Sequence, residues 1–169
     1  MTPFPLGFDA PGARRYVSTT HTRSPELLAD IAAEHQFRGG ARYRPRDITG
    51  DGVRESFCNV HSVDVAEAMG VLIPRGLRAN QLMLWLSMEG VASGWELLTE
   101  HAARAMADEG QLVLACWFNR NGGPGHIAPL VPSLGEPGVW LSNVGGSNFL
   151  RGSVAQAFGD KPVTFFGHP

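Results

Sequence analysis

The sequence predicts an α+β protein in which helices pack on an antiparallel sheet. Segments with helical periodicity and capping residues fill the first two thirds of the chain, and short apolar runs separated by turn residues fill the last third. Because helices come first and strands follow in close succession, the pattern differs from the regular alternation of βαβ units. The length of 169 residues suits one domain with a substantial core.

The chain divides at about residue 24 into an arm and a domain. Residues 1–23 combine prolines and glycines with scattered charge, so we expect an irregular N-terminal arm there. Residues 24–169 contain neither an internal repeat nor a linker. We therefore expect them to form a single domain.

Four helices are predicted from their start and stop signals. Ser24 and Pro25 suit the start of the first helix, because serine accepts a hydrogen bond from unpaired N–H groups and proline fits the first turn. The apolar stripe of this helix ends at Gly39-Gly40. Similar patterns predict helices over residues 57–69, 79–88 and, with Thr99 as N-cap, up to residue 109.

Four strands are predicted after the last of these helices. Residues 112–118 (LVLACWF) are continuously apolar, which is typical of a central strand that is buried on both faces. The turn-rich loop NRNGGPG follows this run. Further strands are expected at residues 126–131, 139–144 and 162–166.

The charge and hydropathy pattern exclude several classes of function. The formal net charge is −2, so the chain has no positive field of the kind that holds nucleic acid or an anionic membrane. No run is long and apolar enough to cross a bilayer, and the first residues do not have the pattern of a signal peptide. We expect a protein made in the cytoplasm that acts elsewhere only after release or export.

The two cysteines differ in their expected surroundings. Cys58 follows a polar loop at the N-terminal end of a predicted helix, where unpaired N–H groups and the helix dipole favour the nucleophilic thiolate. The alternative is a small buried hydrophobic residue, which is a common role of free cysteine. Cys116 lies inside an apolar strand, and we assign it to the core. Two cysteines are too few for a disulfide framework, and their spacing is not that of zinc ligands.

His126 is the candidate partner of Cys58. It follows Gly-Gly-Pro-Gly and begins a predicted strand, so a tight turn would place the imidazole at the edge of the sheet. An imidazole with a pKa of about 6.5 is a natural base for a cysteine, although an exposed loop histidine fits the same pattern. His61 lies one turn after Cys58 and is a secondary candidate for the same cleft.

Asn143 is the candidate that would orient the imidazole. It lies in the strand after that of His126, among apolar residues, and its amide could accept the distal N–H of the ring. Ser142 points to the opposite face in a regular strand, so the choice between the two depends on strand register. A turn residue leading into the following glycines is the structural alternative for Asn143.

These candidates belong to a longer pattern of motifs. A cysteine is followed by asparagine, an aspartate further along the helix, and then a small residue, methionine and glycine; later come a Gly-His-hydrophobic-small strand and a polar strand residue before a glycine. The chain supplies Cys58, Asn59, Asp64, Ala68-Met69-Gly70, Gly125-His126-Ile127-Ala128, Asn143 and Gly145. Over roughly residues 42–166, this order resembles papain-like cysteine hydrolases of the CHAP and NlpC types, which cut amide bonds in peptidoglycan.

The resemblance implies a papain-like catalytic domain with a central antiparallel sheet of about four to six strands and a cleft beside the Cys58 helix. In that domain Cys58 would be the nucleophile, His126 the base and later the acid, and Asn143 the orienting residue. The backbone N–H of Cys58 and a donor from the preceding loop would form the oxyanion hole. Ser56 and Asn59 are the candidates for oxyanion binding or positioning.

The resemblance also implies an activity and partners. The expected reaction is hydrolysis of an amide bond of the peptidoglycan stem peptide through an acyl-enzyme, by an N-acetylmuramoyl-L-alanine amidase or an endopeptidase. A phage lysin and a secreted effector both fit, and an effector would be paired with an immunity protein. The alternatives are a transpeptidase or acyltransferase on the same fold and a non-catalytic binding module.

Residues 47–55 (DITGDGVRE) resemble the first part of an EF-hand calcium loop. Asp47, Thr49 and Asp51 place oxygens at alternate positions, a glycine stands at the turn position, and Glu55 stands where a further ligand often lies. The twelfth position, which takes a bidentate acid in that motif, is Cys58. The loop is therefore either a solvated Asp-Gly turn or a calcium site, and the expected chemistry does not require calcium.

Overall fold

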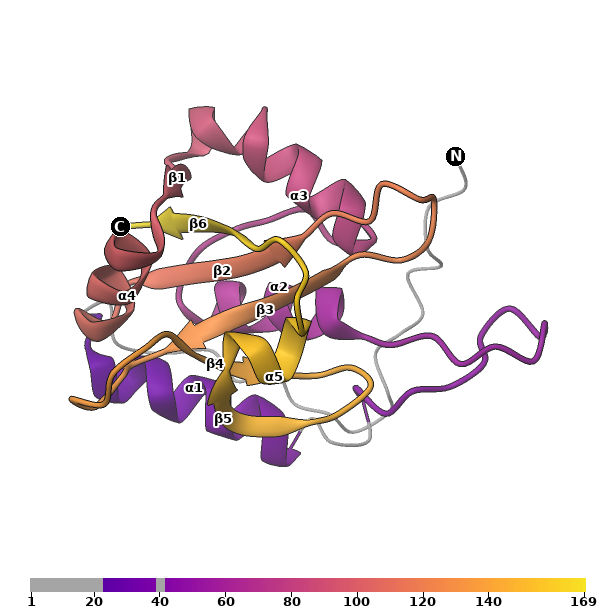
Figure 1. Cartoon of the computed structure of the whole chain (residues 1–169), viewed down its shortest axis with the longest axis horizontal. Coiled ribbons are helices and arrows are strands. Elements are labelled where there is room, and N and C mark those ends of the chain that lie inside the picture. The colour runs from indigo at the N-terminus through magenta and orange to yellow at the C-terminus, as the bar shows by residue number, and fades with distance from the viewer. Residues whose placement is uncertain (1–22, 39–41) are drawn as a thin grey trace.

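The computed structural model describes residues 23–38 and 42–169, which form an antiparallel sheet with helices packed against it (Figure 1). The sheet has six strands in the order β1-β6-β2-β3-β4-β5, and every neighbouring pair is antiparallel. The α+β class and the antiparallel sheet are thus confirmed. Of the predicted arm over residues 1–23, all but the last residue lies outside the described part of the chain.

The four predicted helices are present, and each begins close to its expected residue. The Ser24 hydroxyl accepts a hydrogen bond from the backbone N–H of Leu27, and Thr99 caps its helix by accepting from Ala102 N–H. No helix in residues 23–38 and 42–169 is both long and apolar enough to span a membrane. The helices are α1 (Pro25–Arg38), α2 (Cys58–Ala68), α3 (Ala79–Ser87) and α4 (Glu100–Asp108).

The four predicted strands are also present, and the last of them is displaced along the chain. They are β2 (Leu112–Trp117), β3 (His126–Val131), β4 (Trp140–Asn143) and β6 (Thr164–His168). The expected range 162–166 for the last strand is wrong by two residues at each end. Pro162 has no N–H to donate, so it does not join a strand that pairs with neighbours on both sides.

The sequence did not predict two strands and two short helical segments. The missed elements are η1 (Gly90–Ser93), β1 (Glu96–Leu98), β5 (Phe149–Ser153) and α5 (Val154–Phe158). Both missed strands lie at the edges of the sheet, and each carries exposed side chains. Segments of three to five residues with one bonded edge show too little periodicity for detection.

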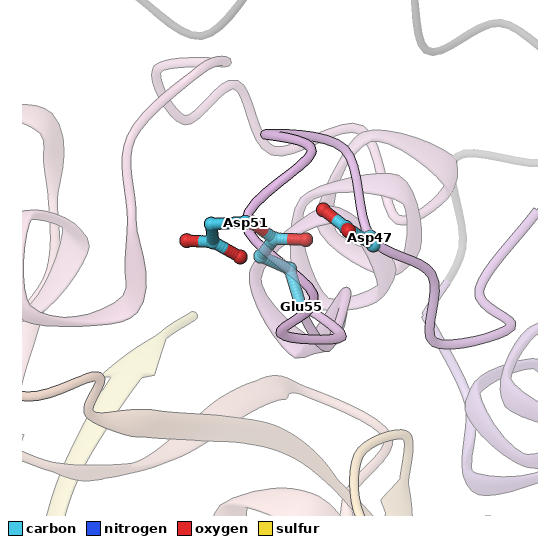
Figure 2. A group of neighbouring side chains, drawn as sticks. All are labelled: Asp47, Asp51 and Glu55. Carbon is cyan, nitrogen blue, oxygen red and sulfur yellow. The ribbon is translucent and has the colours of Figure 1, made fainter.

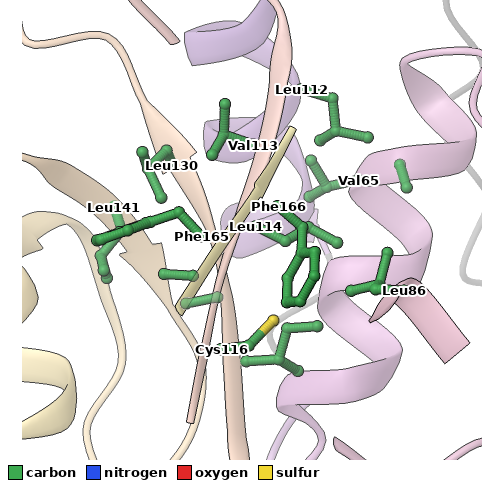
Figure 3. Packing of buried hydrophobic residues seen from close by; sticks show 14 of the residues in the cluster. Val65, Leu86, Leu112, Val113, Leu114, Cys116, Leu130, Leu141, Phe165 and Phe166 are labelled. Carbon is green, nitrogen blue, oxygen red and sulfur yellow. The ribbon is translucent and has the colours of Figure 1, made fainter. Parts of the chain in front are cut away.

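The core lies on both faces of the central strands. All but the last side chain of β2 is buried, which explains its uninterrupted apolar sequence. Phe166 and Cys116 lie between the strands and the helical side chains Val65 of α2 and Leu86 of α3 (Figure 3). This packing holds α2 beside the sheet, where the helix contacts β3 more extensively than any other strand.

A buried carboxylate fixes the other side of α2. Asp64 accepts hydrogen bonds from Arg42 Nε at 2.7 Å, from the Tyr43 hydroxyl at 2.7 Å and from Arg75 Nη2 at 2.8 Å. Burial, the largest influence, raises the pKa of Asp64, but the bonds from Arg42 and Tyr43 and the charge of Arg42 outweigh it and lower the pKa. The segments before and after α2 are therefore held to the helix by one ionised group.

Asp64→Asn should destabilise the fold strongly. The change removes the carboxylate that pairs with the buried Arg42, and breaking a buried pair in this way costs about 3–5 kcal/mol of unfolding free energy at pH 7. Because the folded-state pKa is lowered, this contribution is present above the unfolded-state pKa of about 3.9 and is lost as the pH falls toward the folded-state value. Urea unfolding of both forms at pH 7 and pH 3 measures it.

The matched control is Glu136→Gln, which removes an exposed carboxylate that pairs with Arg151 at 3.0 Å. We expect this surface change to cost less than about 1 kcal/mol. Equal stability of Asp64→Asn and Glu136→Gln at pH 7 would show that the buried network does not hold the fold together.

Candidate active site

Cys58 is the first residue of α2, as the sequence predicted. The N-cap residue Phe57 makes no side-chain hydrogen bond to the helix start, so no side chain competes there with the thiol for the positive end of the helix dipole. The side chain of Cys58 is buried, with 3% of the residue exposed. The Ser56 hydroxyl donates a hydrogen bond to Sγ at 3.9 Å.

His126 is the first residue of β3 and pairs with Trp117 at the end of β2. The loop between these strands is fixed by Asn80 of α3, whose Oδ1 accepts from Asn119 N–H at 3.0 Å. The Asn80 amide also donates to the carbonyls of Asn119 and Gly123. Asn80 thus determines where the imidazole enters the site. This role could not be predicted from the sequence, because the contact joins residues 39 positions apart.

Two glycines allow the chain to come close around this site. A Cβ atom on Gly125 would lie 2.1 Å from Asn80 Oδ1 and 2.6 Å from the Trp117 carbonyl oxygen. A Cβ on Gly145 would lie 3.2 Å from Cε1 of His126. Gly125 has no space for a side chain, and a side chain at position 145 would require the imidazole to shift slightly.

Asn143, at the end of β4, bonds the imidazole and resolves the open question of strand register. Its Oδ1 lies 2.7 Å from His126 Nε2, and its Nδ2 donates to the Ser147 carbonyl at 2.6 Å. Since a carbonyl oxygen can only accept, this second bond fixes Oδ1 toward the ring, so Nε2 carries the hydrogen. Ser142 instead accepts a hydrogen bond from Gln36 of α1 at 3.1 Å.

The thiol and the imidazole shift each other's protonation. Burial, the largest influence, raises the pKa of Cys58, but the hydrogen bond from His126, its positive charge, and bonds from the Ile127 backbone and Ser56 together lower it below the ordinary value. Burial lowers the pKa of His126, and the bond and charge of Cys58 with the bond to Asn143 raise it overall. With Nε2 bonded to Asn143, Nδ1 is the ring nitrogen that faces the thiol, and the pair favours thiolate and imidazolium.

Cys116 provides an internal comparison with Cys58. It is fully buried in β2, and burial, followed by the charge of Cys58, raises the pKa of its thiol far above the ordinary range. The two thiols therefore differ in the direction of their pKa shifts, as the sequence positions indicated. Both cysteines are free.

His61 does not share this site. It is fully buried, its ring meets that of Tyr43 edge-on at 5.1 Å, and burial with the charge of His35 lowers its pKa to about 3. The expectation that His61 faces the same cleft as Cys58 is wrong. Nine residues of α2 are buried, so a residue one turn further along is enclosed by neighbouring segments.

Asn59 acts at a distance from the thiol. Its Nδ2 donates to the Leu77 carbonyl at 2.8 Å, so the side chain ties the first turn of α2 to the segment before α3. Of the two residues predicted for oxyanion binding or positioning, Ser56 therefore contacts Sγ directly, and Asn59 supports the helix that carries it.

A cleft of about 420 Å³ opens beside the imidazole. Its lining includes His126 and Asn143, the aromatic rings of Trp117 and Phe158, and the amine of Lys161. The Phe158 ring lies 4.8 Å from the imidazole between centroids. This residue belongs to α5, and Lys161 follows it, so the missed helix supplies much of the cleft wall.

The predicted calcium loop brings three carboxylates together. One ligand oxygen from each of Asp47, Asp51 and Glu55 lies within 4.8 Å of the others. Figure 2 shows the three neighbouring side chains in close-up. The loop extends away from the sheet (Figure 1), and both aspartates are exposed. Exposed acidic groups of this kind are common without a metal.

Hydrogen bonds within the loop already engage its carboxylates. Asp47 accepts from the backbone N–H groups of Gly50 at 2.6 Å and Gly52 at 2.8 Å, and these bonds lower its pKa. Glu55 accepts from the Thr49 hydroxyl at 3.1 Å. Calcium takes six to eight oxygen ligands, and one oxygen from each of the three carboxylates together with the Thr49 hydroxyl would supply four. Calcium binding therefore stays a prediction, and the loop is accounted for as a hydrogen-bonded turn.

Comparison of the sequence with protein-family models and with curated proteins found no match. The class of the protein is therefore defined by its own architecture. It is an α+β protein in which a thiol, an imidazole and a carboxamide, from the start of α2, the start of β3 and the end of β4, form one connected group.

We expect iodoacetamide to alkylate Cys58 selectively in the folded protein, at a pH below the ordinary thiol pKa of about 8.5. Cys116 should react only after unfolding, because it is fully buried with a raised pKa. In His126→Ala the inflection of the Cys58 rate should move to higher pH, since burial is then opposed only by the bonds from the Ile127 backbone and Ser56. Peptide mapping of alkylation rates from pH 5 to 10 measures both effects, and equal inertness of the two folded thiols would contradict them.

Asn143→Ala should move the same inflection upward by less than His126→Ala does. The bond from Asn143 contributes to the raised pKa of His126, so its loss weakens the imidazolium that stabilises the thiolate. Ser142→Ala is the matched control, because this neighbouring buried side chain bonds Gln36 instead of the imidazole. Identical pH profiles for the two alanine variants would remove Asn143 from the site.

Proposed function

We propose that this protein is a papain-like cysteine hydrolase of the CHAP and NlpC type that cuts an amide bond of the peptidoglycan stem peptide. One observation carries the chemical part of the proposal. The amide of Asn143 is fixed by Ser147, so it holds the Nε2–H of His126 and leaves Nδ1 for the thiol of Cys58. This arrangement is what a cysteine nucleophile with a histidine base requires.

The first half of the proposed reaction forms an acyl-enzyme. Nδ1 of His126 holds the proton of Cys58, and the thiolate attacks the amide carbon, forming a C–S bond as the carbonyl oxygen becomes an oxyanion. The backbone N–H of Cys58 and the Ser56 hydroxyl are the candidate donors to this oxyanion. The imidazolium then gives its proton to the leaving nitrogen, the C–N bond breaks, and the amine departs.

The second half releases the acid. A water molecule gives one proton to Nδ1 of His126 and attacks the thioester carbon. The C–S bond then breaks, the thiol regains the proton from the imidazolium, and the carboxylic acid leaves. No step draws on a metal ion, so the loop of residues 47–55 would affect only the stability of the entry to α2.

The substrate part of the proposal is supported by the motif resemblance over residues 42–166. An N-acetylmuramoyl-L-alanine amidase and a stem-peptide endopeptidase both fit the site. A phage lysin released through the membrane and an effector exported with its immunity protein are the two proposed settings. In both, the protein is made in the cytoplasm and meets the cell wall afterwards.

Digestion of purified peptidoglycan tests this proposal. The wild type should release soluble fragments whose masses identify the cut bond, and Cys58→Ala and His126→Ala should each lower the rate by about 10⁴-fold or more. Cys116→Ala, the matched cysteine control, should remain active. EDTA should leave the rate unchanged, because the three reacting groups need no metal.

Each other outcome identifies the part of the proposal that is wrong. Activity in Cys58→Ala would eliminate the nucleophile. Absence of fragments from a wild type whose Cys58 alkylates normally would eliminate peptidoglycan as the substrate. Loss of activity in EDTA with recovery in calcium would assign a metal to the loop of Asp47, Asp51 and Glu55.

A further inference from the structure

Lys161 stands out in the wall of the cleft because it is the only lysine of the chain. Its ammonium lies 5.0 Å from the centroid of the Trp117 ring and donates to the Phe158 carbonyl at 3.4 Å. These contacts hold the amine in the cleft that also contains His126 and Asn143. An ammonium has three donors, so these two contacts leave hydrogen-bonding capacity for a ligand.

No carboxylate within residues 23–38 and 42–169 forms an ion pair with Lys161. The recorded pairs join arginines to Asp64, Glu67, Asp108 and Glu136 instead. The positive charge of Lys161 acts on His126. Burial, the larger influence, and this charge both lower the pKa of the imidazole. A cation beside a group that must become an imidazolium opposes that protonation unless an anion neutralises it.

The position of Lys161 also indicates which part of a substrate it would meet. In the proposed reaction His126 gives its proton to the leaving nitrogen, so the departing amine segment must lie against the imidazole. The cleft wall on this side is formed by Trp117, Phe158 and Lys161. A segment there would have its apolar part against the rings and a negative group at the ammonium.

We propose that Lys161 selects substrates that carry a carboxylate on the amine side of the scissile bond. The inference rests on the proposed function, because it needs Cys58 as nucleophile and His126 as the acid that protonates the leaving group. The substrate class is then a peptide or amino-acid amide with a free acidic group near the departing nitrogen, and its amidated form is a poorer substrate.

Two alkylating reagents test the charge preference without a known substrate. Iodoacetate and iodoacetamide both form a bond from Sγ of Cys58 to carbon as iodide leaves, and they differ only in carboxylate against carboxamide. The rate constant for iodoacetate divided by that for iodoacetamide should fall by about two- to fivefold in Lys161→Gln, which is the size of effect that exposed ion pairs give. Lys161→Arg should keep the ratio, and 1 M salt should reduce the difference.

Arg54→Gln is the matched control, since it removes one positive charge from an exposed residue outside the cleft lining. The ratio should stay at the wild-type value in this variant. Equal ratios in wild type, Lys161→Gln and Arg54→Gln, with Cys58 still reactive, would overturn the role of Lys161 and leave the proposed hydrolase intact. Inertness of Cys58 to both reagents would overturn the hydrolase and, with it, this inference.

Stem peptides provide the second test. Lys161→Gln should raise KM about two- to fivefold for a peptide with a free carboxylate beside the departing nitrogen, with little change in kcat. The same variant should leave KM for the carboxamide form unchanged. A wild type that prefers neither form would contradict the inference.

Discussion

The bond between Asn143 Oδ1 and His126 Nε2 is the constraint on which the rest of the site depends. Because Ser147 holds the other end of the amide, the imidazole has one defined tautomer and presents Nδ1 to the thiol. Burial alone would keep Cys58 protonated, and the imidazole reverses that effect. The Asn143 amide thus determines the tautomer of His126, and this tautomer leaves Nδ1 free to accept a proton. Proton acceptance by Nδ1 in turn favours the thiolate of Cys58. Cys116 is buried without such a partner, and burial raises the pKa of its thiol instead.

The three side chains linked by these bonds lie at the ends of helices and strands. Cys58 begins α2, His126 begins β3 and Asn143 ends β4, while the bodies of these elements lie in the core. Asp64 fixes the far side of α2 through bonds to the segments before and after it. Asn80 fixes the loop that leads into β3. Each side chain that is proposed to react thus lies at one end of an element whose other residues are packed in the core, and this packing fixes how far apart the three side chains lie.

The sequence predicted the elements with strong local signals and missed those without them. Capping residues and apolar periodicity located four helices and four strands, and the position at an element end singled out Cys58 and His126. The choice between Asn143 and Ser142 was out of reach because the pairing of β4 with β5 shifts register between Leu141 and Asn143, where simple alternation fails. Asn80 was missed for a related reason: its partners are distant in sequence, and an asparagine near a helix start has no distinctive local pattern.

The same distinction separates reactivity from selectivity. The residues proposed to exchange protons lie in motifs, whereas part of the cleft wall comes from α5 and the segment after it, which no sequence pattern identified. Lys161 is one of 14 lysine and arginine residues in a chain with a net charge of −2, so the protein has no long-range field that attracts anions. Its effect must be local, within the roughly 8 Å over which exposed charges interact at physiological salt. Lys161 would then distinguish acidic from neutral substrates by slowing the dissociation of the bound acidic substrate, and not by raising its rate of association.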